Sequence, residues 1–232
     1  MEIEKEESTR EEKVSKMDRE LYWVFGVMVV LIAAFLVGYA IRPDPNTFDH
    51  NGLDFKKQML GNIPLYKYTY FTDNRMATAS GNVINTGEQA AVNVLLRNNP
   101  RENNVPVEGK IEYMEREKFV YITMSSSPDL LCEYGTIAMA ELASFLSQNG
   151  FVPKAGISDE TTAEEQGIDY VTCENHPDRM VISFEAGDEN KVVREENCYT
   201  ITVSDCEILL PTEKFIVQSI LDAMEEDTNP TS

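Results

Sequence analysis

The chain has 232 residues, with 40 acidic and 20 basic side chains and a formal charge of −20. Apolar residues make up 42%, which is too many for a wholly disordered chain and enough for a folded core. The acidity argues against nucleic acid as a partner, because phosphate binding needs a basic surface. With two histidines in the chain, there is little room for a histidine-rich metal centre.

The first predicted element is an N-terminal tail. Residues 1–20 are rich in glutamate and mixed in charge, and they show no apolar periodicity. We expect a disordered cytoplasmic tail, or a helical extension of the apolar segment that follows it.

The strongest feature of the sequence is the apolar segment Leu21–Ile41, which has 21 residues without a charge. As a helix it would be about 31 Å long, which matches the hydrocarbon core of a membrane. Tyr22, Trp23 and Tyr39 lie near its ends, where interfacial aromatic residues are found. The segment therefore predicts a single transmembrane helix, with the lipid bilayer as its partner.

Two alternatives compete with an uncleaved membrane anchor. A buried core helix rarely stays apolar on every face over this length. A cleavable signal peptide could use Gly38-Tyr39-Ala40 as its small-residue site, but its apolar stretch is usually shorter and its leading region briefer. A signal-anchor is the prediction that we carry forward.

The orientation of the anchor follows from charge and cysteine distribution. Five basic residues precede the span, and Arg42, Lys56 and Lys57 are the first to follow it. This asymmetry favours a cytoplasmic N-terminus. All four cysteines lie after the span, which suits an oxidising exterior. We expect a single-pass protein of the cell membrane with its C-terminal domain outside.

After the span, residues 42–47 predict a stiff linker, because Pro43 and Pro45 bar the preceding residues from helical geometry. Residues 48–224 are predicted to form the folded extracytoplasmic domain. Residues 225–232 are acidic and predict a disordered tail.

Within the domain, alternating apolar residues predict eight strands. The middle pair should form a hairpin around residues 115–117, and the pair near the end should form another around residues 187–190. The predicted strands are Leu65–Thr72, Ala90–Leu96, Gly109–Met114, Lys118–Met124, Asp169–Thr172, Met180–Glu185, Lys191–Glu195 and Tyr199–Val203. Asp169–Thr172 should run parallel to Lys118–Met124, because a helix connects them.

The helices are predicted from their caps and apolar spacing. The first begins after the N-cap Ser127, with Pro128 in its first turn, and ends at Asn149-Gly150. A short acidic helix opens at Ser158 and closes at Gly167, and a last helix covers Pro211 to Met224. The expected buried faces are Leu131, Ala138, Leu142 and Phe145 in the first helix, and Phe215, Ile216, Ile220 and Leu221 in the last.

These elements predict a mixed α/β (α+β) domain built in layers, with about seven to eight strands and two main helices.

Four cysteines allow three disulfide connectivities. Cys198 and Cys206 bracket one strand, so they would be about 26 Å apart and could not bond unless the strand breaks. In the expected hairpin of residues 180–195, Cys198 would lie opposite residue 178, near Cys173. Cys132 and Cys206 each follow a strand and lead into a helix, at the same edge of the sheet. We therefore predict the bridges Cys173–Cys198 and Cys132–Cys206.

The alternative for Cys132 is a reactive thiol. It lies in the first turn of the predicted helix, where the helix dipole lowers a thiol pKa. Asp129 and Glu133 oppose this reading, because they add negative charge beside it.

Catalytic motifs are sparse, and no catalytic residue is assigned. Ser125, Ser126 and Ser127 lie at a strand-to-helix turn, and His176 with Asp178 could supply a base and its orienting carboxylate. These serines and His176 define a candidate crevice at the carboxyl edge of the parallel strands. The sequence has no G-x-S-x-G motif and no phosphate-binding loop, so an N-cap and a polar turn explain the serines more economically.

No metal site or cofactor is predicted. Calcium is a weak candidate at two acidic groups, neither with the spacing of a calcium loop: Asp44, Asp49 and Asp54, and Asp188, Glu189 and Asn190. The acidity of the domain favours a cationic or calcium-bridged partner, or reflects a saline habitat. We expect a protein partner of unspecified identity.

Residues 48–55 (FDHNGLDF), Leu96-Arg97-Asn98-Asn99-Pro100-Arg101 and the stretch from Asn197-Cys198 to Asp205-Cys206-Glu207-Ile208-Leu209 form a combined pattern. This pattern resembles an uncharacterised family of small archaeal membrane-anchored proteins. The resemblance covers most of residues 48–224. It implies an archaeal surface or pseudo-periplasmic setting, and it implies no activity.

Physically, the segment from Leu96 to Arg101 reads as a turn shaped by Asn98, Asn99 and Pro100. Arg97 and Arg101 could bind a carboxylate there, either within the domain as an internal ion pair or on a ligand.

Three functional hypotheses follow. The preferred one is a membrane-anchored extracytoplasmic domain with a binding, scaffolding or envelope-associated role. The second is a cell-surface hydrolase or thiol-dependent enzyme that uses the crevice. The third is an accessory subunit of a membrane complex.

Overall fold

The computed structural model describes residues 3–40, 44–77, 83–113 and 119–228. The chain divides into two compact units, Met1–Pro45 and Asn46–Ser232. Among the described residues there are four α-helices and ten strands in two sheets, so the predicted mixed α+β class is confirmed. The predicted hairpin turn, residues 115–117, lies entirely outside the described residues.

The first unit is the helix α1 (Ile3–Ala40). It includes residues 3–20, so the helical alternative for the N-terminal tail is the one observed. Its segment Leu21–Tyr39 has a mean hydropathy of 2.5, and all of its side chains are exposed. Exposed apolar side chains on every face of a helix need lipid or another cover. Within the described residues, this helix is the one long and apolar enough to cross a membrane.

The second unit begins with a four-stranded antiparallel sheet of consecutive strands. The strands are β1 (Thr47–His50), β2 (Leu53–Leu60), β3 (Ile63–Ala77) and β4 (Val83–Leu96). Leu53, Phe55, Tyr66 and Val94 are buried on one face of this sheet, which packs on the core.

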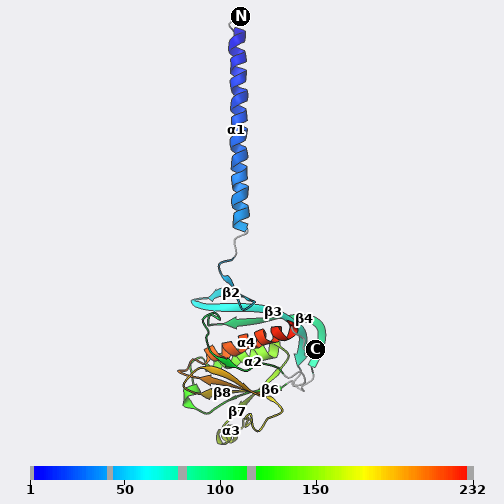
Figure 1. Ribbon diagram of the computed structural model, residues 1–232, viewed down its shortest axis with the longest axis vertical. Coiled ribbons are helices and arrows are strands. Elements are labelled where there is room, and N and C mark those ends of the chain that lie inside the picture. The colour runs from blue at the N-terminus through cyan, green and yellow to red at the C-terminus, as the bar shows by residue number, and fades with distance from the viewer. Residues whose placement is uncertain (1–2, 41–43, 78–82, 114–118, 229–232) are drawn as a thin grey trace. The chain divides into compact units, whose positions relative to one another are not determined.

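The second sheet has six strands in the order β5-β9-β10-β8-β6-β7. They are β5 (Val107–Glu108), β6 (Phe119–Met124), β7 (Val152–Ile157), β8 (Met180–Ala186), β9 (Lys191–Glu195) and β10 (Cys198–Val203). Helices α2 (Gly135–Gln148) and α4 (Leu209–Thr228) lie between the two sheets, and α3 (Glu160–Gln166) lies near β7 (Figure 1). The domain is thus layered as sheet, helices, sheet.

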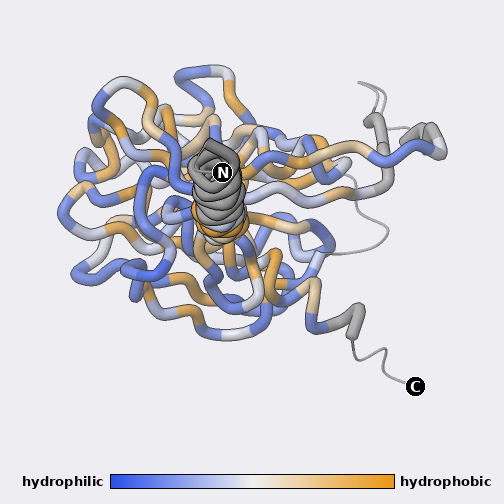
Figure 2. The backbone as a smooth tube through the Cα atoms, turned by 90° about the horizontal axis from the view of Figure 1, so that it is seen from above, coloured by the Kyte–Doolittle hydropathy of each residue, from blue (hydrophilic) through white to orange (hydrophobic). Residues whose placement is uncertain are grey.

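The core lies where the two helices meet the sheets. The rings of Tyr199 on β10 and Phe215 on α4 pack edge to face, with centroids 5.6 Å apart. Hydrophobic and hydrophilic residues alternate along much of the domain chain (Figure 2), as expected where each strand turns one face inward. The predicted inward residues Phe215, Ile216 and Ile220 are buried, and Leu221 is partly buried.

The predicted hairpin of residues 180–195 is wrong. Strand β10 lies between β8 and β9, parallel to β8 and antiparallel to β9. The tight hairpin is the one from β9 to β10, where Glu196 adopts a positive φ of 57°. Local alternation marks a strand, but it carries no information on which neighbour the strand pairs with.

The predicted strand Asp169–Thr172 is also wrong. The strand that runs parallel to β6 after α2 is β7, which the sequence prediction missed. Pro153 and Gly156 obscure it. The proline is tolerated because β7 is an edge strand, and a Cβ at position 156 would lie 2.5 Å from Cγ2 of Val171. Residues around Tyr170 lie beside β7 and make a single parallel bridge, Ile157↔Tyr170.

Other boundaries differ as well. Residues 109–113 form no strand, so the predicted Gly109–Met114 strand is wrong over its described part. Strands β1 and β2 were not predicted. The acidic helix α3 is capped by Asp159 rather than Ser158, and it ends at Gly167 in the left-handed conformation as predicted. Helix α4 continues to Thr228, past Glu225, where the disordered tail is predicted to begin.

The predicted long helix after Ser127 is interrupted. Ser127 does cap a helix, but this is the short 3-10 helix η1 (Pro128–Leu130), and α2 begins only at Gly135. Leu131 has a non-helical ψ of 60° and is 82% exposed, so its predicted burial is wrong.

Both predicted disulfides are confirmed. Cys132–Cys206 has a Cα–Cα distance of 5.2 Å, and Cys173–Cys198 has one of 5.6 Å. The second bridge forms for a different reason than the one predicted, because Cys198 pairs with Val181 at the start of a parallel strand pair. Each bridge stabilises the domain by roughly 2–4 kcal/mol, mainly by restricting the unfolded chain.

Candidate functional site

A cavity of about 480 Å³ lies between helix α2 and the first sheet. Its walls come from the end of the β2–β3 hairpin, from β4 and from α2, with one residue of α4. Most of the lining side chains are apolar, and they include Leu60, Ile63, Leu65, Leu95, Ile137, Ala140, Phe145 and Ile216. The volume is in the range of small-molecule sites, which are mostly apolar with a few placed polar groups.

Glu141 is the carboxylate of helix α2 that lines this cavity. It stands one helical turn from Ile137 and one from Phe145, so these three side chains form a single stripe along the helix. Its Oε2 atom is sealed from solvent and has no hydrogen-bond partner in the described part of the chain. A buried carboxylate oxygen without a partner is costly. A ligand in the cavity would relieve that cost if the carboxyl group turned toward the cavity and accepted a hydrogen bond from it.

Glu213 on α4 is a second buried carboxylate near the cavity, and it is only 1% exposed. Its Oε1 accepts a hydrogen bond from the backbone nitrogen of Arg97 at 2.5 Å, and its Oε2 accepts one from that of Asn98 at 3.0 Å. The turn from Leu96 to Arg101 is therefore held by a carboxylate through its backbone. The role of Glu213 is to anchor this turn to helix α4.

Arg97 is the cation at this end of the cavity. Its guanidinium carbon lies 5.7 Å from the ring centroid of Tyr134. Among the described residues no carboxylate oxygen lies within the 4 Å of an ion pair with Arg97, although its charge acts on both Glu141 and Glu213. Arg97 was expected to form either an internal ion pair or a contact with a ligand. Within the described residues, it forms no internal ion pair.

The opposite end of the cavity is closed by polar side chains of α2. The Gln148 side-chain oxygen accepts a hydrogen bond from the backbone nitrogen of Asn93 at 3.2 Å, on strand β4. Next to it, the hydroxyl of Tyr70 donates to the side-chain oxygen of Asn149 at 2.7 Å. These two contacts join the C-terminal end of α2 to the first sheet.

The two carboxyl groups have unusual acidities. Burial, and to a lesser extent the nearby Glu213 carboxylate, raise the pKa of Glu141 to about 8, and Arg97 opposes this shift. Burial also raises the pKa of Glu213 to about 7, against the hydrogen bonds from Arg97 and Asn98. Strongly shifted groups beside a cavity are typical of functional sites.

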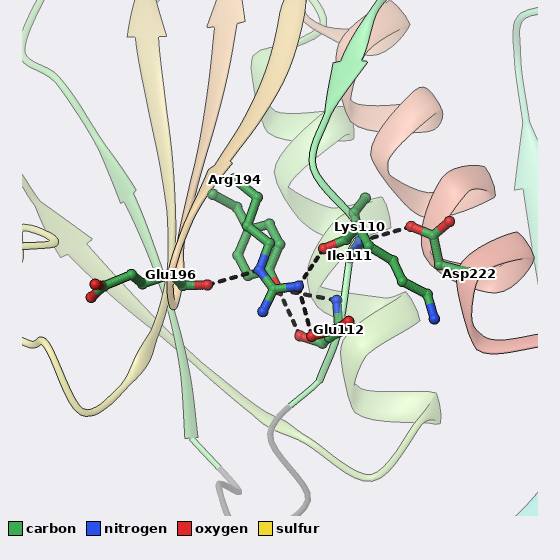
Figure 3. A network of polar contacts seen from close by, with 7 residues as sticks. Lys110, Ile111, Glu112, Arg194, Glu196 and Asp222 are labelled. Atoms are coloured by element: carbon green, nitrogen blue, oxygen red, sulfur yellow. Dashed lines mark hydrogen bonds and ion pairs between the residues drawn. The ribbon is translucent and has the colours of Figure 1, made fainter. Parts of the chain in front are cut away.

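A second polar cluster lies in the same domain, around Arg194 on β9 (Figure 3). Its Nη1 donates to the Lys110 carbonyl at 2.6 Å and contacts Oε2 of Glu112 at 2.8 Å, and its Nε donates to the Glu196 carbonyl at 2.8 Å. The Tyr199 hydroxyl donates to the Glu112 carbonyl at 2.6 Å. We call these residues the Arg194 cluster. Its donors are paired, so its role is to hold residues 110–112 against the second sheet.

The other end of that segment is fixed by α4. Asp222 accepts a hydrogen bond from the backbone nitrogen of Ile111 at 2.7 Å, and its other oxygen accepts one from Gln218 at 2.8 Å. A side chain at Gly109 would lie 2.9 Å from the Cβ of Arg194, so only glycine fits there without a shift.

The serines of the predicted crevice are engaged in local structure. The Ser125 nitrogen donates to the Phe184 carbonyl, Ser126 bonds the Thr162 hydroxyl at 3.2 Å, and Ser127 caps η1. Cys132 is bonded to Cys206 and is not a free thiol.

His176 lies elsewhere on the sheet. Its ring packs on Tyr121, with centroids 4.6 Å apart, and its Nδ1 faces the Asn175 side chain. Tyr121 lies four residues before Ser125, and an extended chain of that length spans roughly 13 Å. The structure therefore does not bring His176 and the serines together.

Arg101 binds within the domain. Its guanidinium donates to the Asp49 carbonyl at 3.2 Å and lies 4.1 Å from the ring centroid of Phe48. In the weak calcium candidate near residue 190, Asn190 bonds Glu207 and Ser204, and Glu189 lies 3.9 Å from Lys191. Within the described residues, no group of three or more His, Cys, Asp or Glu side chains is placed to hold a metal ion.

Comparison with known proteins adds no function to this geometry: no protein-family model, no curated protein and no solved structure matches the chain. The site is therefore interpreted from its residues alone.

The sequence prediction named Arg97 and missed Glu141, which lines the cavity, and the nearby Glu213. A signal for Glu141 was present. Glu141 is the only charged residue of α2, and its neighbours three before and four after, Ala138 and Phe145, are buried. A lone charge beside the apolar stripe of a helix indicates a buried polar role.

Proposed function

We propose that this protein is a membrane-anchored extracytoplasmic binding protein, whose domain holds a small amphipathic amine in the cavity beside Glu141. The observation that carries the proposal is the carboxylate with an unpartnered oxygen, Glu141, in the wall of a mostly apolar cavity. An apolar ligand body would fill the cavity, and an ammonium group would donate hydrogen bonds to the carboxylate.

Charge favours an amine over a carboxylate ligand. Glu141 and the nearby Glu213 are two acidic groups, and Arg97 is a cation whose charge acts on both of them. The chain as a whole carries a formal charge of −20, which attracts cations to the domain and repels anions.

The extracytoplasmic location rests on the apolar segment of α1 and on the two disulfides, which suit an oxidising compartment. We place the N-terminus in the cytoplasm, from the excess of lysine and arginine before the span. The resemblance noted above supports a cell-surface setting. Protease added to intact cells should remove the domain, whereas a domain that is digested only after lysis would contradict this location.

Ligand binding is tested with the full chain in nanodiscs, titrated calorimetrically with octylamine, octanol and octanoate. Discs without protein serve as the blank for partition into lipid. We expect octylamine to bind the wild type roughly tenfold or more tightly than Glu141→Gln, because a charge-assisted hydrogen bond is lost. Glu133→Gln, which changes an exposed carboxylate before α2, is the matched control and should bind like the wild type. Preferential binding of octanoate would overturn the choice of an amine.

The cavity itself is tested by Ala140→Phe. Ala140 is exposed and lines the cavity, so a larger side chain there fills the space without entering the core. This variant should lose binding of octylamine and octanol alike. Unchanged octylamine binding in Ala140→Phe would show that the amine binds at another place.

A further inference from the structure

The β2–β3 hairpin differs in charge from the rest of the domain. Residues 46–72 contain three lysines and two aspartates, for a net charge of +1, whereas residues 73–232 carry −18. The hairpin is thus the cationic corner of a strongly acidic domain. Such a local reversal of charge points to an anionic partner.

The strand register places cationic and apolar side chains on one face of the hairpin. Lys56 lies directly opposite Lys67, and Leu60 directly opposite Ile63. Because side chains on one strand alternate between faces, Phe71 shares this face with Ile63 and Lys67. We call these five residues the hairpin face. Asp54 is the acidic residue of β2 on the same face.

The apolar members of the hairpin face are well exposed. Leu60 is 67% exposed, Ile63 43% and Phe71 67%. A surface that combines exposed large apolar side chains with lysines is suited to an anionic, partly apolar surface.

The position of the hairpin in the sequence identifies that surface. Five residues, 42–46, separate the end of the apolar span from β1, and a fully extended chain of that length reaches at most about 20 Å. The hairpin therefore starts close to the bilayer that holds the span, on the premise that the span is inserted as proposed above.

We propose that the hairpin face lies against the anionic headgroups of the anchoring bilayer, with Lys56 and Lys67 on lipid phosphates and with Leu60, Ile63 and Phe71 in the interfacial layer. Leu60 and Ile63 also line the Glu141 cavity, so the cavity would open beside the lipid from which an amphipathic ligand partitions.

The test uses the full chain in nanodiscs, which leave both membrane surfaces accessible, so the result does not depend on orientation in the cell. A Trp23→Phe background removes the tryptophan of the span. Phe71→Trp is the probe, and Leu131→Trp, at an exposed position on η1's flank, is the matched control. With brominated anionic lipid we expect quenching of the Phe71→Trp fluorescence to exceed that of the control by about twofold or more.

The lysines are tested in the same discs. Lys56→Glu with Lys67→Glu should abolish the excess quenching, and Lys191→Glu should preserve it. Equal quenching of probe and control, or quenching that is the same in zwitterionic discs, would overturn the proposal. The proposal would also be overturned if the tryptophan of Phe71→Trp were shielded only in discs that hold two chains, because the hairpin face would then be an interface between copies. Octylamine binding in these variants is measured separately, so failure of the ligand proposal can be distinguished from failure of the hairpin proposal.

Discussion

The site around Glu141 and the Arg194 cluster are both partly buried, charged and built on the same core, yet they differ in how their polar atoms are paired. Arg194 has carbonyl and carboxylate acceptors at 2.6–2.8 Å, and the hydroxyl of Tyr199 is bonded on both sides to Glu112. Glu141 has a buried oxygen without a partner in the described residues, and Arg97 has no carboxylate within ion-pair distance there.

This difference separates structural polar groups from binding groups. A fully paired cluster lowers the energy of the folded chain and leaves nothing for a ligand to satisfy. An incompletely paired carboxylate beside an apolar cavity costs stability in the unliganded protein, and a ligand can recover that cost. The comparison yields four predictions, in order of decreasing effect.

The largest effect is expected from pH. The pKa of Glu141 is about 8 in the folded domain and about 4.5 in the unfolded chain, so the folded state binds more protons between these values. The free energy of unfolding should therefore fall as pH rises from 5 to 8, by on the order of 3 kcal/mol. Glu213, with its pKa raised to about 7, adds to the same trend. Urea unfolding of the domain in the full chain measures the slope.

Two variants sharpen this prediction. Glu141→Gln cannot ionise, so its unfolding free energy should depend less steeply on pH than that of the wild type. Glu133→Gln should keep the wild-type slope. If Glu141→Gln also keeps that slope, the pH dependence arises from other groups. In the wild type, octylamine affinity should instead rise with pH, by up to about tenfold per unit below the pKa of Glu141.

The second effect contrasts the two arginines. Arg194→Ala removes three short contacts, among them those to the Lys110 and Glu196 carbonyls, so we expect a loss of about 2–3 kcal/mol. Arg97→Ala removes a guanidinium without an ion pair in the described residues and should cost less than about 1 kcal/mol. Chemical denaturation of both variants makes the comparison, and equal losses would contradict it.

The third effect concerns the hydroxyl of Tyr199. Tyr199→Phe keeps the ring contact with Phe215 and removes both hydrogen bonds to the Glu112 backbone. We expect a loss of about 1–2 kcal/mol in the free energy of unfolding. Hydrogen exchange at Glu112 should accelerate in this variant, and unchanged protection there would show that the backbone is held by other contacts.

The smallest effect is expected at Tyr134. Tyr134→Leu removes the ring that faces the Arg97 guanidinium at an exposed position, which should cost about 0.5 kcal/mol. Octylamine affinity should change little, since Tyr134 does not line the cavity. A large loss of affinity would place the ring in the binding site.

The sequence was most informative where one residue type has one physical meaning over a short range. The uncharged segment Leu21–Ile41 is recognised by its length, Ser127 by its capping geometry and Gly167 by its left-handed backbone. Both disulfides were also predicted, although the reason given for Cys173–Cys198 relied on a hairpin that does not form.

Sequence reasoning failed where partners are distant along the chain. Alternation identified β8, β9 and β10 as strands, but their order in the sheet depends on the packing of β9 and β10 on α4 and on the pairing of the strands with each other. Strand β7 was missed because proline is acceptable in a strand at an edge, and because Gly156 is explained by the close approach of Val171; both are properties of the finished fold.

The sequence by itself determined the apolar helix that is long enough to span a membrane, the disulfide-stabilised mixed domain and most of its strands, because hydrophobic length, capping and alternation act between near neighbours. Only the tertiary structure decided the strand order, the break before α2, the meeting of Glu141 and Arg97 at one cavity, and the approach of Glu213 to both. These features depend on contacts between residues up to 116 positions apart, such as Arg97 with Glu213, and no local pattern encodes such a contact.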